Sequence, residues 1–111
     1  MPHLKFKAIP ENVVAELSLV LPELLAPLLG TTKDNFSFEY IQSKFYEQGA
    51  VTSFYPYVEF GWFDRGQHIQ DECAKLITES IQLRSPSEYV VVVFQDLPKS
   101  AYYENSKNFS K

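Results

Sequence analysis

Two stretches of the chain carry apolar residues at spacings of three and four, the spacing that places them on one face of a helix. The first stretch predicts a helix over 11–29 and the second a helix over 67–83. Four shorter stretches are rich in aromatic and β-branched residues, which favour strands. The predicted strands cover residues 3–8, 35–45, 57–63 and 88–95.

The second half of the chain restates the first at an offset of 54 residues, which aligns Pro2 with Pro56 and Phe6 with Phe60. The halves cover about 2–55 and 56–111, and each reads strand, helix, strand. Each is long enough for a parallel crossover connection. We therefore expect one domain over 1–111 of the α/β (α+β) class, with a four-stranded mixed sheet built from two pseudo-symmetric β-α-β units and both helices on one face.

The ends of the predicted helices are marked by residues that stop a helix. Gly30 suits the left-handed turn that closes the first helix, and Arg84-Ser85-Pro86 closes the second. Pro22 conflicts with the first helix, because proline inside a helix removes a backbone hydrogen bond and costs about 3 kcal/mol. We expect a kink at Pro22, or two short helices in place of one.

The last predicted strand is apolar on both faces, as in a strand that is buried on both sides. Two helices cover only one face, so Val91 and Val93 require another cover, which an oligomer supplies most simply. Polar residues of the other strands fall on that same face. Cross-strand charge pairing or the lining of a channel or site explains them: Lys5, Lys7, Glu39 and Glu59.

Composition narrows the class of protein further. The 111 residues are 45% hydrophobic and 22% charged, which is typical of a globular domain. The net charge of −4 argues against a nucleic-acid duplex as a partner. No apolar run approaches membrane length and no signal peptide precedes Pro2, so we expect neither a membrane nor an export route. The single Cys73 excludes an internal disulfide and favours a cytoplasmic location.

Three segments carry a family resemblance that extends over the whole chain. The chain opens Met1-Pro2-His3, it continues through Trp62-Phe63-Asp64-Arg65-Gly66-Gln67, and its tail contains Tyr102-Tyr103-Glu104-Asn105. With the doubled strand–helix–strand pattern, these segments resemble the tautomerase superfamily, which includes macrophage migration inhibitory factor and 4-oxalocrotonate tautomerase. They look most like an uncharacterised bacterial branch of it.

The resemblance implies a cofactor-free isomerase in which Pro2 is the general base. Removal of Met1 would free the prolyl amine, and burial would lower the pKa of that amine toward neutrality. Such an amine takes a proton from carbon next to a carbonyl and returns it elsewhere, here on a small 2-oxo or 2-hydroxy acid. Read from the residue alone, Pro2 is better explained as a rigid strand starter, and it is the resemblance that brings the catalytic interpretation level with this one. The resemblance also implies a homotrimer with its pockets between subunits.

Arg65, Tyr102 and Tyr103 are the other candidate site residues. An Arg fork binds a carboxylate in two-point fashion, and Arg65 lies just before the second helix; it could instead pair with Asp64 or Glu72 at the surface. Tyr102 or Tyr103 could donate a phenol hydrogen bond to an enolate oxygen. Aromatic anchors at a subunit interface explain these two tyrosines as well.

The last strand departs from the inhibitory factor, because Val91 and Val93 stand where that family member has tyrosine and asparagine. Lys33 lies near its pocket lysine, although counting from Gly30 puts Thr31 at that place. The pocket floor is then more apolar, and a different substrate preference is implied. A second hypothesis is therefore a non-catalytic oligomeric binding protein, in which Pro2 is a structural relic.

The remaining polar singletons have structural interpretations. We expect His3 to face solvent or a neighbouring subunit, His68 to be exposed, and Cys73 to be a small core residue. His, Cys and acidic residues lack metal-ligand spacing, and the four glycines form no phosphate loop, so we expect neither a metal nor a cofactor.

Overall fold

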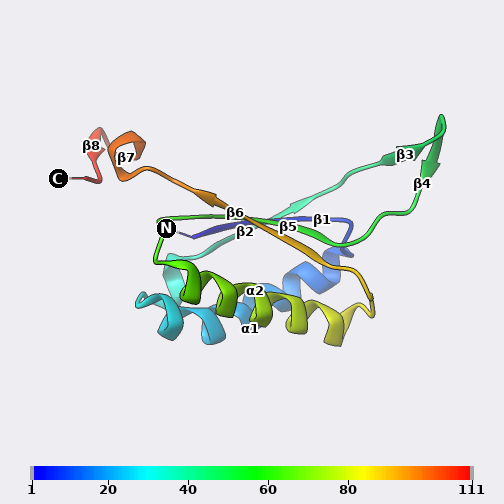
Figure 1. Ribbon diagram of the computed structural model, residues 1–111, viewed down its shortest axis with the longest axis horizontal. Coiled ribbons are helices and arrows are strands. Elements are labelled where there is room, and N and C mark those ends of the chain that lie inside the picture. The colour runs from blue at the N-terminus through cyan, green and yellow to red at the C-terminus, as the bar shows by residue number, and fades with distance from the viewer. Residues whose placement is uncertain (1, 111) are drawn as a thin grey trace.

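The centre of the structure is a mixed four-stranded sheet made from two strand–helix–strand units (Figure 1). The computed structural model describes residues 2–110. The four strands, in the sheet order β2-β1-β5-β6, are β2 (Ser37–Ile41), β1 (His3–Lys7), β5 (Tyr57–Trp62) and β6 (Val91–Asp96). Each unit pairs its strands in parallel, β1 with β2 and β5 with β6, and the units meet where β1 and β5 run antiparallel. The predicted fold class is confirmed.

Both helices cover the same face of this sheet (Figure 1), as the strand pattern predicts. They are α1 (Glu11–Leu29) and α2 (Gln67–Arg84). Buried residues alternate along β1, where Leu4 and Phe6 turn toward the helices, and Val58 and Phe60 do the same on β5. Their side chains meet the apolar stripes of α1 and α2 in one continuous core, and this core fixes the position of the strand that Pro2 begins.

Helix α1 begins and ends where the sequence predicts, but it is not interrupted. The carbonyl oxygen of Pro10 accepts from the backbone N–H groups of Val13 and Val14. Gly30 closes the helix in the left-handed conformation with φ of 68°. One helix of 19 residues continues through Pro22, in place of the two short helices that we considered. Leu21 and Leu25 on either side are fully buried, and burial of such side chains contributes about 2 kcal/mol each, which offsets the lost hydrogen bond.

The same helix corrects one expectation about membranes. Residues Glu11–Leu29 reach the length and, with a mean hydropathy of 1.6, the apolar character of a membrane-spanning helix, which the sequence reading missed. The apolar stripe of α1 packs against the sheet and α2, as in the core helix of a globular protein. Burial of this stripe accounts for the composition of the helix.

Two hairpins were not predicted. Strand β2 ends at Ile41 rather than 45, and a hairpin of β3 (Phe45–Glu47) and β4 (Ala50–Thr52) follows it. We call residues 45–52 the hairpin arm. The tail of the chain also folds, into a C-terminal arm of residues 99–110 that contains one short 3₁₀ helix and two short strands. These elements are η2 (Lys99–Ala101), β7 (Tyr103–Glu104) and β8 (Lys107–Asn108).

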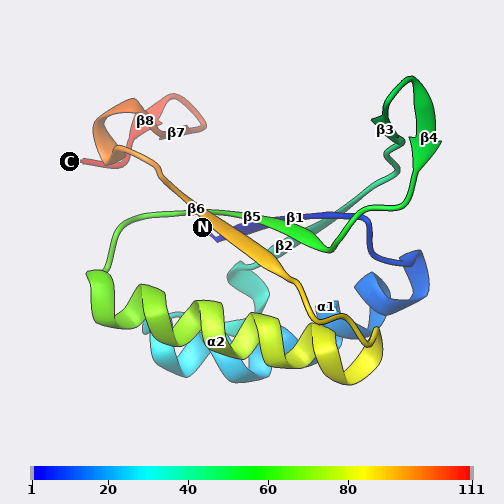
Figure 2. The same cartoon turned by 45° about the vertical axis from the view of Figure 1, so that its right-hand side comes forward.

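Both arms stand off the sheet on the side away from the helices, at opposite ends, in two views of the molecule (Figures 1 and 2). Each arm turns through two residues with positive φ, Gln48-Gly49 in one and Asn105-Ser106 in the other. Positive φ at both positions is the geometry of the tightest hairpin turn, whose twist matches that of the strands.

We call the sheet surface opposite the helices the open face. Its central members alternate with the core residues along each strand, and they are His3, Lys5, Lys7, Ser37, Glu39, Tyr57, Glu59, Val91 and Val93. The predicted charge pairing occurs, because Lys7 Nζ lies 3.0 Å from Glu59 Oε1. Val91 and Val93 are half-buried in this single chain, so the face carries apolar surface that neither helix covers.

Candidate functional site

Pro2 is fully buried at the start of the central strand β1. Its carbonyl oxygen accepts a hydrogen bond of 3.0 Å from the backbone N–H of Ser37, which extends the pairing with β2 by one residue. On the other side, His3 pairs with Gly61, so the antiparallel register continues from Pro2 toward Trp62. The residue that the sequence singled out as a base is therefore held between two strands and sheltered from solvent.

Trp62 links this end of β1 to the rest of the candidate site. Its side chain is fully buried, and its indole Nε1–H donates to Asp96 Oδ1 over 2.8 Å. The guanidinium carbon of Arg65 lies 5.7 Å from the Trp62 ring centroid, within the range of a cation–π contact. The end of β5 thus brings Arg65 to the same end of the sheet as the start of β1.

Arg65 is held by the backbone rather than by Asp64 or Glu72. Its Nε–H donates to the carbonyl oxygen of Leu29 at 3.0 Å, and its Nη1 donates to that of Phe63 at 2.7 Å. A guanidinium has five N–H donors, so three remain for another acceptor. The side chain is half-buried. Arg65 can therefore fasten α1 to the end of β5 and still present part of its fork to a ligand.

Tyr102 anchors the C-terminal arm to this end of the sheet. Its ring packs edge-on against Phe63, with 5.1 Å between ring centroids, and against Phe109 at 5.0 Å. Burial, followed by the hydrogen bond from its hydroxyl to Glu104, raises the pKa of Tyr102 above its usual value. The phenol is thus fully protonated at neutral pH. Tyr103 differs, because its side chain is 61% exposed.

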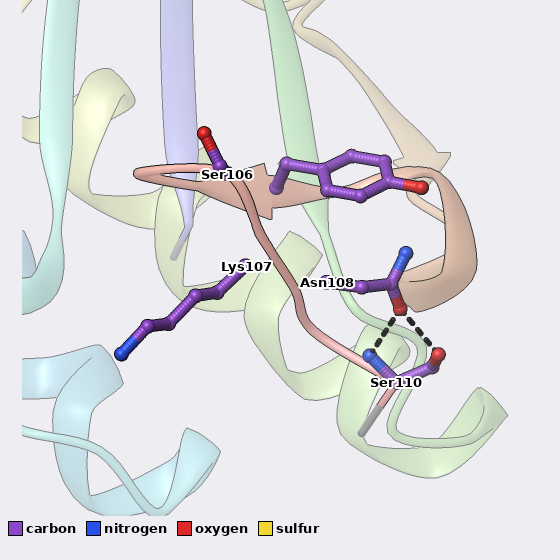
Figure 3. A pocket seen from close by; sticks show the side chains of 5 residues that line it. Ser106, Lys107, Asn108 and Ser110 are labelled. Carbon is purple, nitrogen blue, oxygen red and sulfur yellow. Dashed lines mark hydrogen bonds between the residues drawn. The ribbon is translucent and has the colours of Figure 1, made fainter.

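Tyr103 belongs to a pocket that lies entirely within the C-terminal arm (Figure 3). Asn108 shapes the floor of this pocket, since its Oδ1 accepts from the backbone N–H of Ser110 at 2.9 Å and from the Ser110 hydroxyl. Ser106 and Lys107 complete the lining. Pro2 and Arg65 do not line it, so the structure does not bring Tyr103 together with them in one pocket of the single chain.

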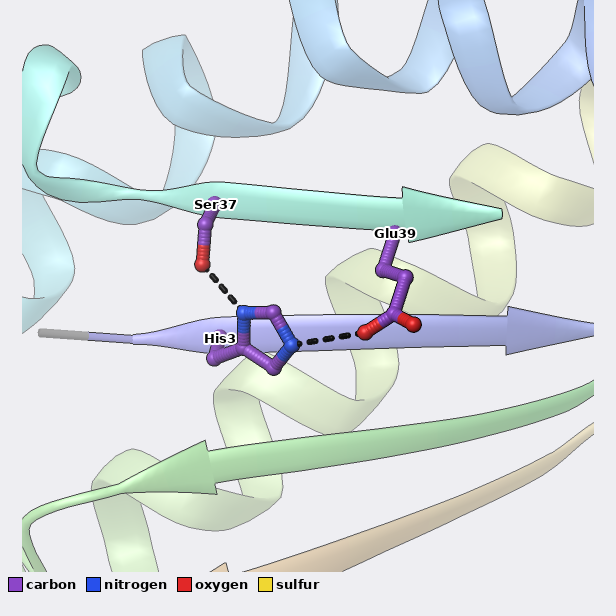
Figure 4. A network of polar contacts seen from close by, with 3 residues as sticks. All are labelled: His3, Ser37 and Glu39. Atoms are coloured by element: carbon purple, nitrogen blue, oxygen red, sulfur yellow. Dashed lines mark hydrogen bonds and ion pairs between the residues drawn. The ribbon is translucent and has the colours of Figure 1, made fainter. Parts of the chain in front are cut away.

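A polar cluster that sequence reasoning missed lies beside Pro2. The imidazole of His3 lies over β1, and the side chains of Ser37 and Glu39 reach it from β2, so that Nδ1 contacts the Ser37 hydroxyl and Nε2 lies 3.0 Å from Glu39 Oε1 (Figure 4). His3 was expected to face solvent or a neighbour, and its side chain is 39% exposed while also bonding within the chain. Knowledge of the parallel register, His3 opposite Ser37, would have revealed this cluster.

The other singletons match their structural interpretations. Cys73 is fully buried in the core, and this burial raises the pKa of its thiol to about 11, so it is no nucleophile at neutral pH. His68 is exposed in the first turn of α2. Within residues 2–110, no three His, Cys, Asp or Glu side chains are grouped closely enough to hold a metal ion.

A protein family and several solved structures share this fold. The family model described as "Domain of unknown function (DUF1904)" matches residues 1–108. The chain belongs to this family. A DUF1904 crystal structure from Sebaldella termitidis is 28% identical, with a TM-score of 0.91 over 98% of this chain and 100% of that one. A Vibrio cholerae protein of unknown function is 37% identical, with a TM-score of 0.86 over 97% of this chain and 87% of that one.

More distant structures connect this DUF1904 member to the tautomerase fold. A macrophage migration inhibitory factor homologue from Prochlorococcus marinus is 18% identical, with a TM-score of 0.72 over 97% of each chain. A fused 4-OT, described as an asymmetric trimer, is 14% identical, with a TM-score of 0.82 over 97% of this chain and 96% of that one. Comparison with curated protein sequences yields no match. The predicted resemblance to the tautomerase superfamily is confirmed for the fold.

Proposed function

We propose that this protein is a cofactor-free tautomerase in which the amine of Pro2 transfers the proton. The observation that carries the proposal is the full burial of Pro2 at the start of the central strand, in a fold shared with the tautomerase superfamily. Burial disfavours the charged form of an amine, and a neutral amine is the form that accepts a proton. Removal of Met1 is part of the proposal, since it creates the free secondary amine.

The reaction is a proton shift with no other reactant. The prolyl nitrogen takes the enol O–H proton, and the electron pair of that bond stays on the oxygen of the resulting enolate. As this pair forms the carbonyl, the electron pair of the carbon–carbon double bond takes the proton from the prolyl ammonium, which restores the neutral amine. Every atom and electron is conserved, so the reaction needs no metal, nucleotide or oxidant.

Arg65 and the two tyrosines support a carboxylic acid as the substrate. The three N–H groups that Arg65 does not give to the backbone suit the carboxylate of a 2-oxo or 2-hydroxy acid. Tyr102 is the phenol that packs nearer to the end of the sheet where Arg65 lies, through its ring contact with Phe63, and it is protonated at neutral pH. We assign Arg65 the carboxylate and Tyr102 or Tyr103 the enolate oxygen.

The test combines a mass measurement with an assay. Intact-mass analysis should find the chain without Met1. A retained Met1 would block the amine and refute the proposal. Ketonisation of phenylenolpyruvate and of 2-hydroxymuconate is then measured for the wild type and for Pro2→Ala. Pro2→Ala keeps a terminal amine but exchanges the secondary amine of proline for a primary one, so the rate should fall, by at most the about 10²- to 10⁴-fold that a general base contributes. Equal rates in the two proteins would show that the proline is not needed as the base.

We also infer that the working form is a homotrimer that associates through the open face. Val91 and Val93 leave apolar surface on this face, and both arms extend from the same side of the sheet (Figure 2). The fused 4-OT of the same fold is described as a trimer. Light scattering after size exclusion should give three times the 12.8 kDa mass of the chain. A mass of one chain would contradict the trimer.

A matched pair of variants locates the interface. Val93 lies opposite Glu59 in the register of β5 and β6, so Val93→Glu places two like charges side by side on the open face. This variant should dissociate the trimer. Leu83→Glu makes the same kind of change at an 81% exposed position on α2 and should leave the trimer intact. Dissociation by Leu83→Glu alone would place the interface on the helices instead.

The second hypothesis, a non-catalytic oligomeric binding protein, has an observation of its own. A pocket at the opposite end of the sheet from Pro2 is lined by aromatic rings of the hairpin arm and its flanks. Phe45 stacks on Phe54, and Phe54 on Tyr55, with centroid distances of 4.1 and 3.9 Å. Such exposed rings suit binding more than chemistry. Activity that survives Phe54→Ala but not Pro2→Ala favours the tautomerase; the absence of any activity favours this alternative.

A further inference from the structure

The His3–Ser37–Glu39 cluster joins the two parallel strands of the first unit on the open face (Figure 4). His3 follows Pro2 in the chain, and the backbone N–H of Ser37 donates to the Pro2 carbonyl oxygen. The Ser37 hydroxyl is therefore held beside His3, the residue that follows Pro2. Its position in space depends on the same peptide group that holds Pro2.

The hydrogen-bond partners of the imidazole determine its tautomer. An ionised carboxylate accepts hydrogen bonds and cannot donate one, so the contact of 3.0 Å with Glu39 Oε1 requires the hydrogen on His3 Nε2. In the neutral ring Nδ1 then carries a lone pair. The Ser37 hydroxyl, which contacts Nδ1, must donate its hydrogen to it.

Protonation of the ring reverses the last of these hydrogen bonds. An imidazolium donates from both nitrogens, so Nδ1–H now points at Ser37 Oγ and the oxygen becomes the acceptor. The hydroxyl hydrogen of Ser37 is turned away from His3 and is free to bind another oxygen. One proton on His3 thus changes Ser37 from a group committed to the ring into a free donor.

We propose that Ser37 is a substrate-binding residue of the Pro2 site, which donates a second hydrogen bond, beside that of the tyrosine, to the carbonyl oxygen of a 2-oxo acid, and that His3 and Glu39 are positioning residues that direct its hydroxyl. This inference rests on the proposed tautomerase function. A carbonyl that becomes an enolate gains negative charge on oxygen, and a donor aimed at that oxygen stabilises it. The donor is free when His3 is charged, whereas the Pro2 amine must be neutral to act as the base, so the rate should pass through a maximum and fall on both sides of it.

The charged groups around His3 belong to three strands of the open face. Glu39 on β2 bonds the ring directly, and Lys5 follows two residues along β1. Glu59 on β5 pairs with Lys5 in the register, diagonal to His3, which itself faces Gly61. The neighbours thus carry both signs of charge, and Glu39 is the charged side chain that bonds the ring. The freed amine of Pro2, one residue before His3, adds a positive charge when it is protonated.

The first test reads the ring itself and needs no substrate. Nitrogen chemical shifts of the two histidines, measured at pH 8.5, report which ring nitrogen carries the hydrogen. We expect a larger share of the Nε2–H form in His3 than in His68, which is exposed on α2 and serves as the control, and a fall of this share toward that of His68 in Glu39→Ala. A His3 ring mostly in the Nδ1–H form would overturn the proposal.

The second test compares pH profiles of kcat/KM for phenylenolpyruvate. The wild type should lose activity at alkaline pH, where His3 gives up its proton, and at acid pH, where the Pro2 amine gains one. Ser37→Ala should be about 10- to 100-fold slower at the maximum and should keep only the loss at acid pH. Ser18→Ala removes an exposed hydroxyl of α1 and should match the wild type. A Ser37→Ala profile that parallels the wild type would overturn the proposal.

The two proposals fail in different ways. If Pro2→Ala is inactive while Ser37→Ala keeps the wild-type profile, Pro2 remains the base and only the role of Ser37 is lost. If Pro2→Ala is as active as the wild type, the tautomerase mechanism fails and the Ser37 proposal fails with it. A wild type without activity on either substrate overturns both.

Discussion

The Nε–H of Arg65 donates a hydrogen bond over 3.0 Å to the carbonyl oxygen of Leu29, the last residue of α1. The final carbonyl groups of a helix have no partner within it, and they carry the negative end of the helix dipole. A guanidinium at this place satisfies one carbonyl and neutralises that charge. Arg65 therefore connects the first unit of the fold to the turn that precedes α2.

Replacement of Arg65 by alanine should destabilise the protein. The variant loses two charge-assisted hydrogen bonds, and we expect the free energy of unfolding to fall by about 2 kcal/mol in urea titrations. Arg65→Lys should recover only part of this loss, since lysine lacks the planar fork. As a control, Lys33→Ala removes an exposed ion pair with Glu23 and should cost less than about 0.5 kcal/mol. A similar loss from both alanine variants would contradict a specific role for Arg65.

Gly30 should be sensitive to substitution for conformational reasons alone. A Cβ added at Gly30 meets nothing within 4 Å, but its φ of 68° is unfavourable for other residues, so Gly30→Ala should cost about 1 kcal/mol. Gly61 lies on β5 with ordinary φ, and a Cβ there makes ordinary contacts of 3.7 Å. Gly61→Ala should change stability by less than about 0.5 kcal/mol. Thermal unfolding of the two variants measures the difference, and equal costs would show that space rather than φ decides.

The Cys73 thiol gives a pH dependence with a definite sign. Burial raises its pKa from 9.0 to about 11, so the native state favours the protonated thiol more than the unfolded chain does. This contribution to stability is complete below pH 9 and is lost as the pH rises from about 9 to about 11. Wild-type stability should therefore decline relative to Cys73→Ala over that range. A constant difference between the two proteins would show that the thiol is not held in its protonated form.

Reaction with a disulfide reagent gives an independent check on Cys73. The native thiol should react at pH 8 at least about 100-fold more slowly than in urea, because both burial and protonation protect it. The same reagent rate in native and unfolded protein would contradict the buried position.

Tyr102 should hold the C-terminal arm in place, while Tyr103 should not. Tyr102→Ala removes two aromatic contacts, each contributing about 0.5–1.5 kcal/mol, so the arm should open about tenfold more often or more. Limited trypsin digestion measures this opening through cleavage after Lys99 and Lys107. Tyr103→Ala, at a 61% exposed position, is the matched control and should digest like the wild type. Equal acceleration in both variants would refute the anchoring role.

The helices could be predicted closely because local residues determine their ends. The expected span 11–29 is that of α1, bounded by Pro10 and Gly30, and the expected span 67–83 differs from α2 by one residue. The strands were less certain. The expected strand 35–45 stops at Ile41 because the aromatic residues beyond it stack on one another in the hairpin arm and not in the core. Pattern alone does not distinguish these two uses of aromatic residues.

The candidate site could be predicted only where chemistry resides in a single residue. Pro2 and Arg65 were singled out from the sequence by the family resemblance and by the chemistry of their groups. Ser37 was not, and Glu39 was placed on the same face without its bond to His3, because these connections cross 34 and 36 residues and depend on the strand register. The role of Trp62 escaped for the same reason, since its hydrogen bond to Asp96 needs β5 and β6 to be paired.

The position of Trp62 also provides an optical probe. The chain contains one tryptophan, and it lies fully buried at the end of the sheet where β1 begins, in contact with Arg65. Its fluorescence therefore comes from a single, known place. A carboxylate that draws Arg65 away from the indole ring would alter the emission, so candidate compounds can be screened for occupancy by titration, without labels and before any turnover is detected.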